Sequence, residues 1–303
     1  MKESLNKRND CRLCGDKKLK SVISLTSTPP ANAFITKEQI SNKQECFPLE
    51  VFFCENCSHV QMLDIIDPKI LFENYVYISG TSPVFINHFQ DYANNVIKKF
   101  PELQKKFVID FGSNDGTLLR FFKEAGFSVL GIDPAKDIAR RANELGIETV
   151  TGFISSELAK EIRKEKGHAQ IITANNVFAH SDDLKGIADS ASILLEDSGI
   201  FIIELSYLLD VLEKNLFDTI YHEHLAYHSI KPLSNFFLKN DFEIIDILRV
   251  NSHGGSVRVI AQKRGGPYPV SRSVSDILKL ETEMKLDKIE TYHIFSENIK
   301  KRK

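Results

Sequence analysis

The stretch that decides the fold reads Val108-Ile-Asp-Phe-Gly-Ser-Asn-Asp-Gly-Thr117. An apolar run ends at Asp110, a polar turn lies between Gly112 and Gly116, and a helical pattern begins at Thr117. A strand, a glycine-rich turn and a helix in this order place the turn at the carboxyl edge of a parallel sheet, where open α/β folds bind ligands. The two glycines allow a tight turn and a close approach of the backbone to such a ligand.

The sequence on both sides repeats the alternation of strand and helix. Short runs rich in β-branched or aromatic residues predict strands at residues 107–111, 128–132, 169–174 and 199–205. Helical patterns predict helices at residues 117–125, 138–145 and 184–195. A hairpin with an antiparallel last strand is predicted at residues 242–250 and 256–262. The expected fold is therefore a doubly wound, Rossmann-like α/β sheet.

Two kinds of cofactor compete for the glycine turn. A dinucleotide favours G-x-G-x-x-G, because its pyrophosphate sits on bare backbone at the helix N-terminus. Here the spacing is G-x-x-x-G, Asn114 stands where the middle glycine would be, and Asp110 and Asp115 would repel a phosphate. S-adenosylmethionine has no phosphate and carries cationic ammonium and sulfonium groups, so the same acids favour it. The turn therefore predicts S-adenosylmethionine as the cofactor.

Polar residues follow two further predicted strands at the same edge of the sheet. Asp133 ends the second strand, about where an acid binds both ribose hydroxyls of a nucleotide cofactor. Asn175 and Asn176 follow the third strand. The predicted cofactor-binding residues are then Asp110, Gly112, Asn114, Gly116, Asp133, Asn175 and Asn176.

The N-terminal region holds all five cysteines of the chain. Cys11 and Cys14 form one C-x-x-C pair and Cys54 and Cys57 another, and four thiolates close the tetrahedral shell of a structural zinc ion. Four unrelated thiols and a redox C-x-x-C are the alternatives, although neither pair follows a strand and opens a helix as a redox motif does. The remaining Cys46 is expected to be a small core residue.

Composition excludes several classes of protein. The 303 residues are 42% hydrophobic and 26% charged, with a formal net charge of −2 and a pI of about 6.5, so a nucleic-acid partner is not expected. No apolar run is long enough to span a membrane, and the polar N-terminus lacks the apolar segment of a secretory signal. The expected location is the cytoplasm, where cysteines favour metal binding over disulfides.

These patterns divide the chain into a zinc-binding module at residues 1–72, an α/β domain at residues 73–265 and a helical extension at residues 266–303. The module is loop-rich and is expected to have little core of its own. In the extension, residues 274–303 read as one charged helix with Ile277, Leu280 and Met284 on its apolar face. Such a face needs a surface to pack on, so self-association or a partner chain is expected there.

Titratable side chains gather in the segment Tyr221-His-Glu-His224, and His228 follows four residues later. A cleft with a general base and helping groups explains such a cluster, since imidazole titrates near neutral pH. The alternatives are a polar loop with mixed contacts and a metal site on His224 and His228 at i, i+4 spacing.

Together these motifs resemble those of the sugar C-methyltransferases, which are similar to the 3-C-methyltransferases of nucleotide-linked 4-keto-deoxyhexoses. The resemblance runs from Cys11 to Arg264 with the motifs in the same order. It rests on the two C-x-x-C pairs, Tyr75-Val-Tyr-Ile-Ser-Gly-Thr-Ser82, the glycine turn, Asn176-Val-Phe-Ala-His180 and the Y-H-E-H motif. It implies an enzyme that uses S-adenosylmethionine to methylate the carbon next to a ketone of a nucleotide-linked keto-deoxysugar.

The resemblance also implies roles for individual residues. His224 matches the proposed base, Glu223 and Tyr221 match residues that line the sugar, and Tyr75 and Tyr77 match tyrosines that reach over the site. A base of near-neutral pKa suits proton removal next to a carbonyl, and tyrosine hydroxyls suit the enolate oxygen that develops. The set is completed by His180 as a further active-site histidine and by Ser82 on the cofactor side.

Other functions stay open at this point. O- or N-methylation of another metabolite needs no base for a carbon acid, and a non-catalytic partner subunit needs no substrate. A metallohydrolase built on His222, His224 and His228 is a further alternative. Members of the resembled family continue into a second α/β lobe that helps to bind the nucleotide-sugar. A chain that stops at Lys303 is therefore expected to be a short variant or a truncated form.

Overall fold

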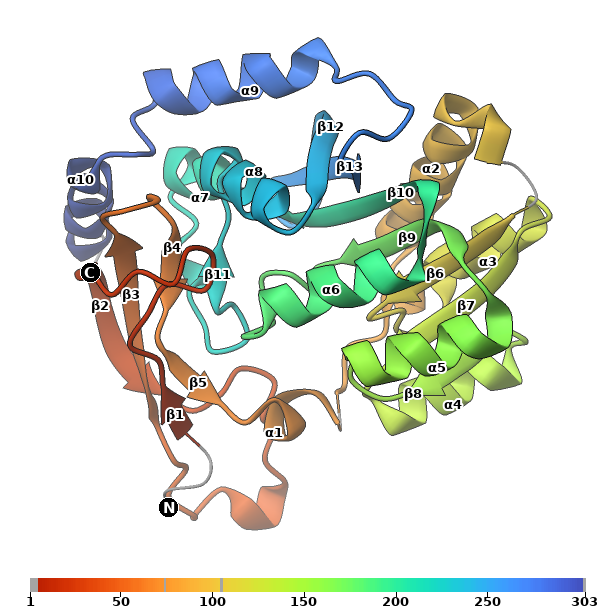
Figure 1. The fold of residues 1–303 in the computed structure, drawn as a ribbon. Helices are drawn as coiled ribbons and strands as arrows, with labels where there is room; N and C mark the ends of the chain where they lie inside the picture. Colours follow the sequence, from red (N-terminus) through yellow and green to blue (C-terminus); the bar gives the residue numbers. More distant parts are fainter. Residues whose placement is uncertain (1–4, 74, 104–105, 302–303) are drawn as a thin grey trace.

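The computed structural model describes residues 5–73, 75–103 and 106–301 (Figure 1). A seven-stranded sheet in the order β12-β13-β10-β9-β6-β7-β8 forms the centre, and a four-stranded sheet, β11-β4-β3-β2, lies beside it. The strands from β10 to β8 in this order are parallel, and β13 and β12 complete the large sheet as an antiparallel hairpin. The predicted doubly wound α/β sheet is thus confirmed.

The predicted strands of the large sheet all form, with small changes at their ends. They are β6 (Phe107–Phe111), β7 (Ser128–Asp133), β9 (Ala169–Asn175), β10 (Leu195–Ser206), β12 (Phe242–Val250) and β13 (Ser256–Lys263). β10 starts earlier than predicted because Leu195 pairs with Ala169 before a bulge. The edge strand β8 (Thr149–Thr151) is not predicted, because three residues are too few to show an alternating pattern.

Helices cover both faces of the large sheet, as a parallel sheet requires. One face carries α2 (Pro83–Lys99), α3 (Thr117–Glu124) and α4 (Lys136–Glu144), packed through buried side chains such as Phe89 and Phe122. The other face carries α5 (Ser156–Lys166), α6 (Leu184–Leu194) and α8 (Ile230–Lys239). Because β6, β7, β9 and β10 are parallel, their carboxyl ends meet at one edge of the sheet (Figure 1).

The N-terminal region forms a small sheet whose core is shared with later parts of the chain. β2 (Leu19–Thr28) and β3 (Phe47–Cys54) pair as a long hairpin, β4 (Val60–Met62) pairs with β3, and β11 (Ala226–Tyr227) pairs with β4. Side chains of α7 (Leu208–Lys214) and α10 (Ile289–Lys300) complete the apolar cluster under this sheet. β1 (Leu5–Lys7) and β5 (Asp64–Ile66) form a separate two-stranded pair.

Residues 274–303 do not form one helix, so that prediction is wrong. α9 (Arg272–Glu283) and α10 are separated by a turn in which Lys285 has a φ of 57°. The turn lets α9 pack beside β12 and α8, while α10 packs on β2 through Phe295 and Ile299. The surface on which this segment packs is therefore its own chain, and Met284, predicted on the apolar face, is 39% exposed. Residues 302 and 303 of the predicted helix lie outside the described residues.

The remaining elements are short. They are α1 (Pro68–Phe72) and the 3-10 helices η1 (Lys37–Gln39), η2 (Ser79–Thr81), η3 (Pro101–Leu103) and η4 (Phe217–Thr219). Among the helices that the structure describes, none has the length and apolar character needed to cross a membrane.

Candidate active site

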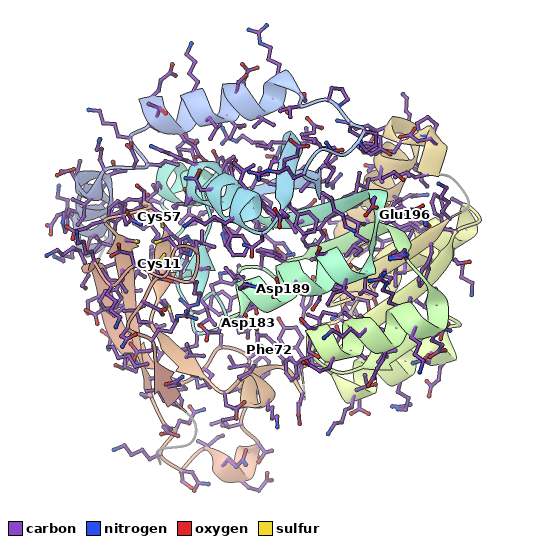
Figure 2. The ribbon with its side chains drawn as sticks, in the orientation of Figure 1. Cys11, Cys57, Phe72, Asp183, Asp189 and Glu196 are labelled. Carbon is purple, nitrogen blue, oxygen red and sulfur yellow. The ribbon has the colours of Figure 1, made fainter. Side chains whose placement is uncertain are left out.

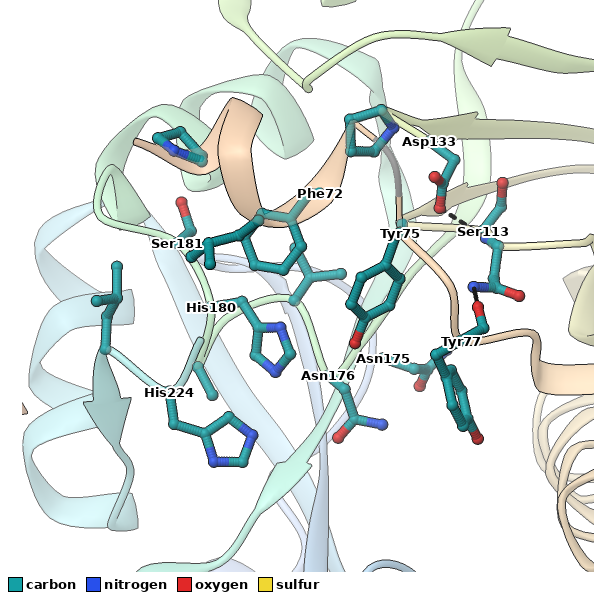
Figure 3. A pocket seen from close by; sticks show the side chains of 18 of the residues that line it. Phe72, Tyr75, Tyr77, Ser113, Asp133, Asn175, Asn176, His180, Ser181 and His224 are labelled. Carbon is teal, nitrogen blue, oxygen red and sulfur yellow. Dashed lines mark hydrogen bonds between the residues drawn. The ribbon is translucent and has the colours of Figure 1, made fainter. Parts of the chain in front are cut away.

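A large cavity opens at the carboxyl edge of the parallel strands, where β5, α1 and the loop between β2 and β3 face the large sheet. Figure 3 shows part of its lining. Its volume is about 790 Å³, in the upper part of the usual range for small-molecule sites, which leaves room for two substrates side by side. We call the wall formed by Asp110, Gly112, Asn114 and Asp133 the glycine-loop side. We call the wall formed by Tyr75, His180, Tyr221 and His224 the histidine side.

The glycine loop needs a left-handed backbone at three positions. Gly112, Asn114 and Gly116 have φ values of 68°, 52° and 76°, which glycine and asparagine adopt more readily than other residues. A Cβ atom at Gly112 would lie 2.5 Å from the Val177 side chain, and one at Gly116 would lie 2.7 Å from Ile147. The G-x-x-x-G spacing therefore follows from the path of the backbone between β6 and α3.

Two carboxylates border this loop. Asp110 is the last residue but one of β6 and accepts a hydrogen bond from the Thr173 hydroxyl at 2.6 Å, and burial raises the pKa of Asp110 to about 7. Asp133 ends β7 and accepts hydrogen bonds from the backbone N–H groups of Asn114, at 2.8 Å, and Ala135, at 2.9 Å. Burial raises the pKa of Asp133, and these two N–H groups oppose the rise. Both carboxylates line the cavity, as the sequence predicts.

The glycine loop also forms hydrogen bonds with residues 77–80, the segment that leads into α2. Asn114 Oδ1 accepts a hydrogen bond from the Ser79 N–H, and Asn114 Nδ2 donates to the Tyr77 carbonyl, both at 2.9 Å. Asp115 accepts hydrogen bonds from the Gly80 N–H at 3.1 Å and from the Thr117 hydroxyl at 2.6 Å. The sequence places the Asp115 carboxylate against the cofactor. In the structure it instead holds the segment of residues 77–80 that leads into α2.

Several buried polar atoms on the cavity wall have no hydrogen-bond partner within the described protein. They are the Ser113 hydroxyl, both side-chain atoms of Asn175 and the Ser206 hydroxyl. Buried polar groups in native proteins are nearly always satisfied. These atoms, together with Asp110 and Asp133, therefore fit a polar ligand with hydroxyl, amino and carboxyl groups, as S-adenosylmethionine has.

His224 is held in one tautomer on the opposite wall. Its Nδ1 lies 2.8 Å from the Thr219 carbonyl, which can only accept, so Nδ1 carries the proton. Nε2 then has a free lone pair and accepts a hydrogen bond from the Tyr221 hydroxyl at 2.9 Å. Burial lowers the pKa of His224 to about 4, so the ring is neutral at physiological pH. The geometry presents an unprotonated imidazole nitrogen at the cavity.

Aromatic rings support this histidine. The rings of His180 and His224 have centroids 5.0 Å apart, and Phe72 stacks on His180 at 5.7 Å (Figure 3). Burial lowers the pKa of His180 well below its usual value, so it is neutral as well. The histidine side therefore combines apolar rings with uncharged nitrogen atoms.

Glu223 does not line the cavity wall, in contrast to the role implied by resemblance. It is 1% exposed, and its carboxylate accepts hydrogen bonds from the Tyr75 hydroxyl at 3.0 Å and from Asn32 Nδ2 at 2.9 Å. Tyr75 and Asn32 do line the cavity. Glu223 thus contacts the site through two residues that come from the N-terminal part of the chain.

Most of the predicted site residues meet at the cavity. Those in its lining are Tyr75, Tyr77, Asp110, Gly112, Asn114, Asp133, Asn175, Asn176, His180, Tyr221 and His224. The described lining does not include Gly116 and Ser82, which stand at the N-caps of α3 and α2.

Sequence reasoning missed many of the other lining residues, and four of them matter most for the geometry of the cavity. They are Asn32, Phe72, Phe85 and His253. His253 has a φ of 47°, precedes Gly254 and Gly255 in the β12–β13 turn, and packs on Phe85 with ring centroids 4.5 Å apart. The predicted hairpin turn at this sheet edge is the signal that could have found His253. For Asn32 the preceding Pro-Pro turn gives no such signal.

The four predicted zinc-binding cysteines come together at the end of the β2–β3 hairpin. Their sulfur atoms all lie within 4.8 Å of one another, with Cys11 Sγ 3.6 Å from Cys57 Sγ and Cys14 Sγ 3.6 Å from Cys54 Sγ. A zinc–sulfur bond of about 2.3 Å places sulfur atoms about 3.8 Å apart in a tetrahedral shell. The geometry therefore fits one zinc ion, and Figure 2 shows Cys11 and Cys57 on the inner side of the small sheet.

The two C-x-x-C turns have matching backbones. The N–H of Gly15 donates to the Cys11 carbonyl and the N–H of Ser58 donates to the Cys54 carbonyl, each at 2.8 Å. Gly15 and Ser58 both have positive φ values, 76° and 66°. The long gap between the pairs is explained by the hairpin that it forms. Cys46 is exposed, so its prediction as a core residue is wrong.

The histidines do not form a metal site in the described part of the chain, where the four cysteines are the one cluster with suitable spacing. His222 Nε2 lies 3.2 Å from the Phe47 carbonyl, and His228 Nε2 lies 3.4 Å from the Phe178 carbonyl. The three histidines of the metallohydrolase alternative thus point to different partners.

Comparison with known proteins gives three family matches in the same order as the structural regions. Residues 11–72 match a zinc binding domain, residues 86–247 a methyltransferase domain, and residues 251–303 a C-methyltransferase C-terminal domain. The C-methyltransferase NovU of Streptomyces niveus is 30% identical over 296 residues, which cover 98% of this chain and 70% of that protein. A ubiquinone biosynthesis O-methyltransferase of Hydrogenovibrio crunogenus is 30% identical over 125 residues, covering 38% of this chain and 51% of that protein.

Among solved structures, a S-adenosylmethionine-dependent methyltransferase from Clostridium acetobutylicum is similar with a TM-score of 0.48 and 15% identity, over 58% of this chain and 92% of that one.

The methyltransferase domain match covers more than half of the chain, so the protein is an S-adenosylmethionine-dependent methyltransferase with an added zinc-binding domain. With the NovU relationship and the C-terminal domain match, the chain belongs to the C-methyltransferase family. The predicted family, cofactor and zinc ion are thereby confirmed. This assignment replaces the two alternatives of a non-catalytic subunit and a metallohydrolase.

Proposed function

We propose that the protein methylates the carbon next to the ketone of a nucleotide-linked keto-deoxysugar, with His224 as the base that removes the proton from that carbon. The observation that carries this proposal is the fixed tautomer of His224. Thr219 holds the proton on Nδ1, so the lone pair is on Nε2, where it accepts a hydrogen bond from the Tyr221 hydroxyl until a substrate proton replaces that donor. O- or N-methylation needs no base aimed at a carbon acid, whereas C-methylation next to a ketone does.

The residues around His224 suit the formation of an enolate. The Tyr221 hydroxyl, which donates to Nε2 in the free protein, can turn to the ketone oxygen as negative charge develops there. His180 and Phe72 keep water from one side of the imidazole. His224 then carries the proton as an imidazolium, so the proton moves from carbon to Nε2.

The glycine-loop side would hold the methyl donor. Asp133 would accept hydrogen bonds from the ribose hydroxyls, and Asp110 and Asn175 would contact the amino acid end. Bound there, S-adenosylmethionine supplies an electrophilic methyl group to the carbon that has lost its proton. The task of this chain is to hold the two substrates in line across the cavity.

The lining carries a charge pattern that limits which part of the acceptor enters. No lysine or arginine is found among the lining residues that the structure describes, although five aspartates are. A diphosphate would be repelled by such a wall. The sugar ring would therefore enter the cavity while a linked nucleotide diphosphate remains outside it.

The proposed zinc ligands are Cys11, Cys14, Cys54 and Cys57, in a closed structural shell that leaves no position for catalytic water. Their reduced state fits the proposed location in the cytoplasm, where thiols are kept reduced.

The test is the chemical position of the transferred methyl group. The protein is incubated with S-adenosylmethionine labelled with ¹³C in the methyl group and a panel of nucleotide-linked keto-deoxysugars, and products are analysed by NMR. The proposal predicts a new methyl signal bonded to carbon next to the ketone. A label found on oxygen or nitrogen, or no transfer to any keto-sugar by zinc-loaded protein that binds the donor, contradicts it.

A further inference from the structure

The loop that joins β2 to β3 reaches from the zinc-binding domain into the active site. It begins with the turn Pro29-Pro30-Ala-Asn32, in which the N–H of Ala33 donates to the Pro30 carbonyl at 3.4 Å. Asn32 has a φ of 60° and lines the cavity. This is a left-handed conformation that asparagine tolerates better than most residues. The zinc-binding cysteines lie at the other end of the same hairpin.

Asn32 contacts a carboxylate that is almost fully buried. Its Nδ2 donates to Glu223 Oε1 at 2.9 Å, while the Tyr75 hydroxyl donates to Glu223 Oε2 at 3.0 Å. Both oxygens accept hydrogen bonds, and these two donors favour the carboxylate form of Glu223. Within the described chain no lysine or arginine pairs with Glu223, although it is 1% exposed. Two neutral donors therefore satisfy a buried anion.

We infer that Asn32 is a positioning residue of the acceptor site: it holds the Glu223 carboxylate, which in turn fixes the Tyr75 ring on the cavity wall. This inference rests on the proposed function for its activity readout only. It adds a polar contact between the zinc-binding domain and the acceptor site to the apolar lining that the same domain supplies, for example through Phe72.

The electrostatics of Glu223 support this role. Burial raises the pKa of Glu223, and the hydrogen bonds from Asn32 and Tyr75 oppose the rise. The titratable groups that face Glu223 are Tyr75 and Tyr221. Burial, and after it the negative charge of Glu223, raises the pKa of both phenols and keeps them protonated. Its chain neighbours point elsewhere, His222 to the Phe47 carbonyl and His224 to Thr219.

Removal of the Asn32 amide would take away the protein donor to Glu223 Oε1. A hydrogen bond to a charged group is worth enough to shift a pKa by about one unit or more. The sign is upward, because a donor that favours the carboxylate is lost. Protonated Glu223 is a weaker acceptor than the carboxylate, so the hydrogen bond from the Tyr75 hydroxyl to Oε2 weakens and the ring is held less firmly.

The experiment compares Asn32→Gly with Asn42→Gly, since Asn42 is an exposed asparagine of the same loop. Glycine keeps the left-handed backbone at residue 32 without strain. We expect Asn32→Gly to lower kcat about tenfold, to move the acidic limb of kcat about one pH unit upward, and to leave the dissociation constant of S-adenosylmethionine unchanged. Asn42→Gly should behave as wild type. Asn32→Asp, which keeps the shape and places a second acid beside Glu223, should move the limb further in the same direction.

A readout without turnover separates this inference from the proposed function. The pKa of Glu223 is followed by NMR of ¹³C-labelled glutamate carboxyl groups, with Glu223→Gln to assign the signal. An increase of about one unit in Asn32→Gly supports the positioning role even if no keto-sugar is methylated. An unchanged Glu223 pKa overturns it, and so does a fall in kcat with an unmoved acidic limb, since that pattern indicates a general structural effect.

Discussion

The glycine-loop side and the histidine side of the cavity are built in different ways. On the glycine-loop side, Asp133 accepts hydrogen bonds from backbone N–H groups of residues 114 and 135, so a short stretch of chain shapes it. On the histidine side, Asn32, Tyr75 and Glu223 come from segments up to 191 residues apart and contact each other through side chains. Because the two sides are built separately, we expect donor binding to survive changes that abolish acceptor chemistry. The predictions below compare the two sides through catalysis, stability and donor binding.

The largest expected effect is on the histidine side. His224→Ala removes the proposed base, and loss of a positioned general base costs about 10²–10⁴-fold in rate. We expect kcat for methyl transfer to fall by that factor. The dissociation constant of S-adenosylmethionine, measured by calorimetry, should stay within about twofold, because the described partners of His224 are Thr219, Tyr221 and His180, outside the glycine loop.

The matched control is His168→Ala, since His168 is an exposed histidine remote from the cavity lining. It should methylate as fast as wild type. A wild-type kcat in His224→Ala would contradict the assignment of His224 as the base. Loss of donor binding in this variant would contradict the independence of the two sides.

The two sides also bury groups whose pKa values are shifted in opposite directions. Burial lowers the pKa of His224 from 6.5 to about 4 and raises that of Asp110 from 3.8 to about 7. The His224 contribution to stability is present above pH 6.5 and is lost as the pH falls through 4. The Asp110 contribution is present below pH 3.8 and is lost as the pH rises through 7. The two oppose each other in the same window.

Single variants separate these contributions in urea unfolding of the free protein. Asp110→Asn should remove the pH-dependent contribution of Asp110 to the free energy of unfolding, about 4 kcal/mol. The stability of this variant should therefore rise relative to wild type as the pH increases from 4 to 7. His224→Asn should remove the pH-dependent contribution of His224 to the free energy of unfolding, about 3 kcal/mol. This variant should therefore lose less stability than wild type as the pH falls from 6.5 to 4. Zinc content is checked at each pH. Parallel curves for all three proteins would show that neither group is shifted.

A smaller effect is expected from Asp133→Asn on the glycine-loop side. The amide cannot accept at both positions, so one of the two backbone N–H bonds and the contact with the donor ribose are lost. Hydrogen bonds to charged groups are worth about 1.5–3 kcal/mol, which corresponds to donor binding weaker by about 10–100-fold. Asp137→Asn, on the exposed face of α4, is the matched control. Calorimetry that finds unchanged donor affinity for Asp133→Asn places the donor elsewhere.

The smallest effect is expected from Tyr221→Phe. The variant loses the hydroxyl that donates to His224 Nε2 in the free protein and is proposed to turn to the ketone oxygen during the reaction. At about 0.5–1.5 kcal/mol for one neutral hydrogen bond, kcat should fall about 2–10-fold. Donor affinity should not change. Stopped-flow or steady-state assays that find an unaltered kcat would exclude Tyr221 from the chemistry.

The sequence predicts the glycine-loop side well, because local backbone rules determine it. Gly112, Asn114 and Gly116 adopt the left-handed conformations that their residue types favour, and Asp133 stands at the end of its predicted strand. The four cysteines are equally predictable, since a two-residue gap alone lets each pair reach one ion.

The histidine side is only partly predictable. Asn32 and Phe72 line the cavity because the N-terminal sheet packs against the later chain, and no periodic pattern encodes that packing. The break between α9 and α10 is hidden for the same reason. The turn lets α9 pack on α8 and α10 pack on β2, and these two surfaces come together only in the folded protein.

The most direct test of the account follows the proton that His224 is proposed to remove. The protein is incubated with a nucleotide-linked keto-deoxysugar in D₂O without S-adenosylmethionine, and deuterium incorporation is measured by mass spectrometry and NMR. We predict that wild type exchanges the hydrogen on the carbon next to the ketone and that His224→Ala does not. Equal exchange by both proteins, or no exchange by a wild type that methylates the same sugar, would contradict His224 as the base.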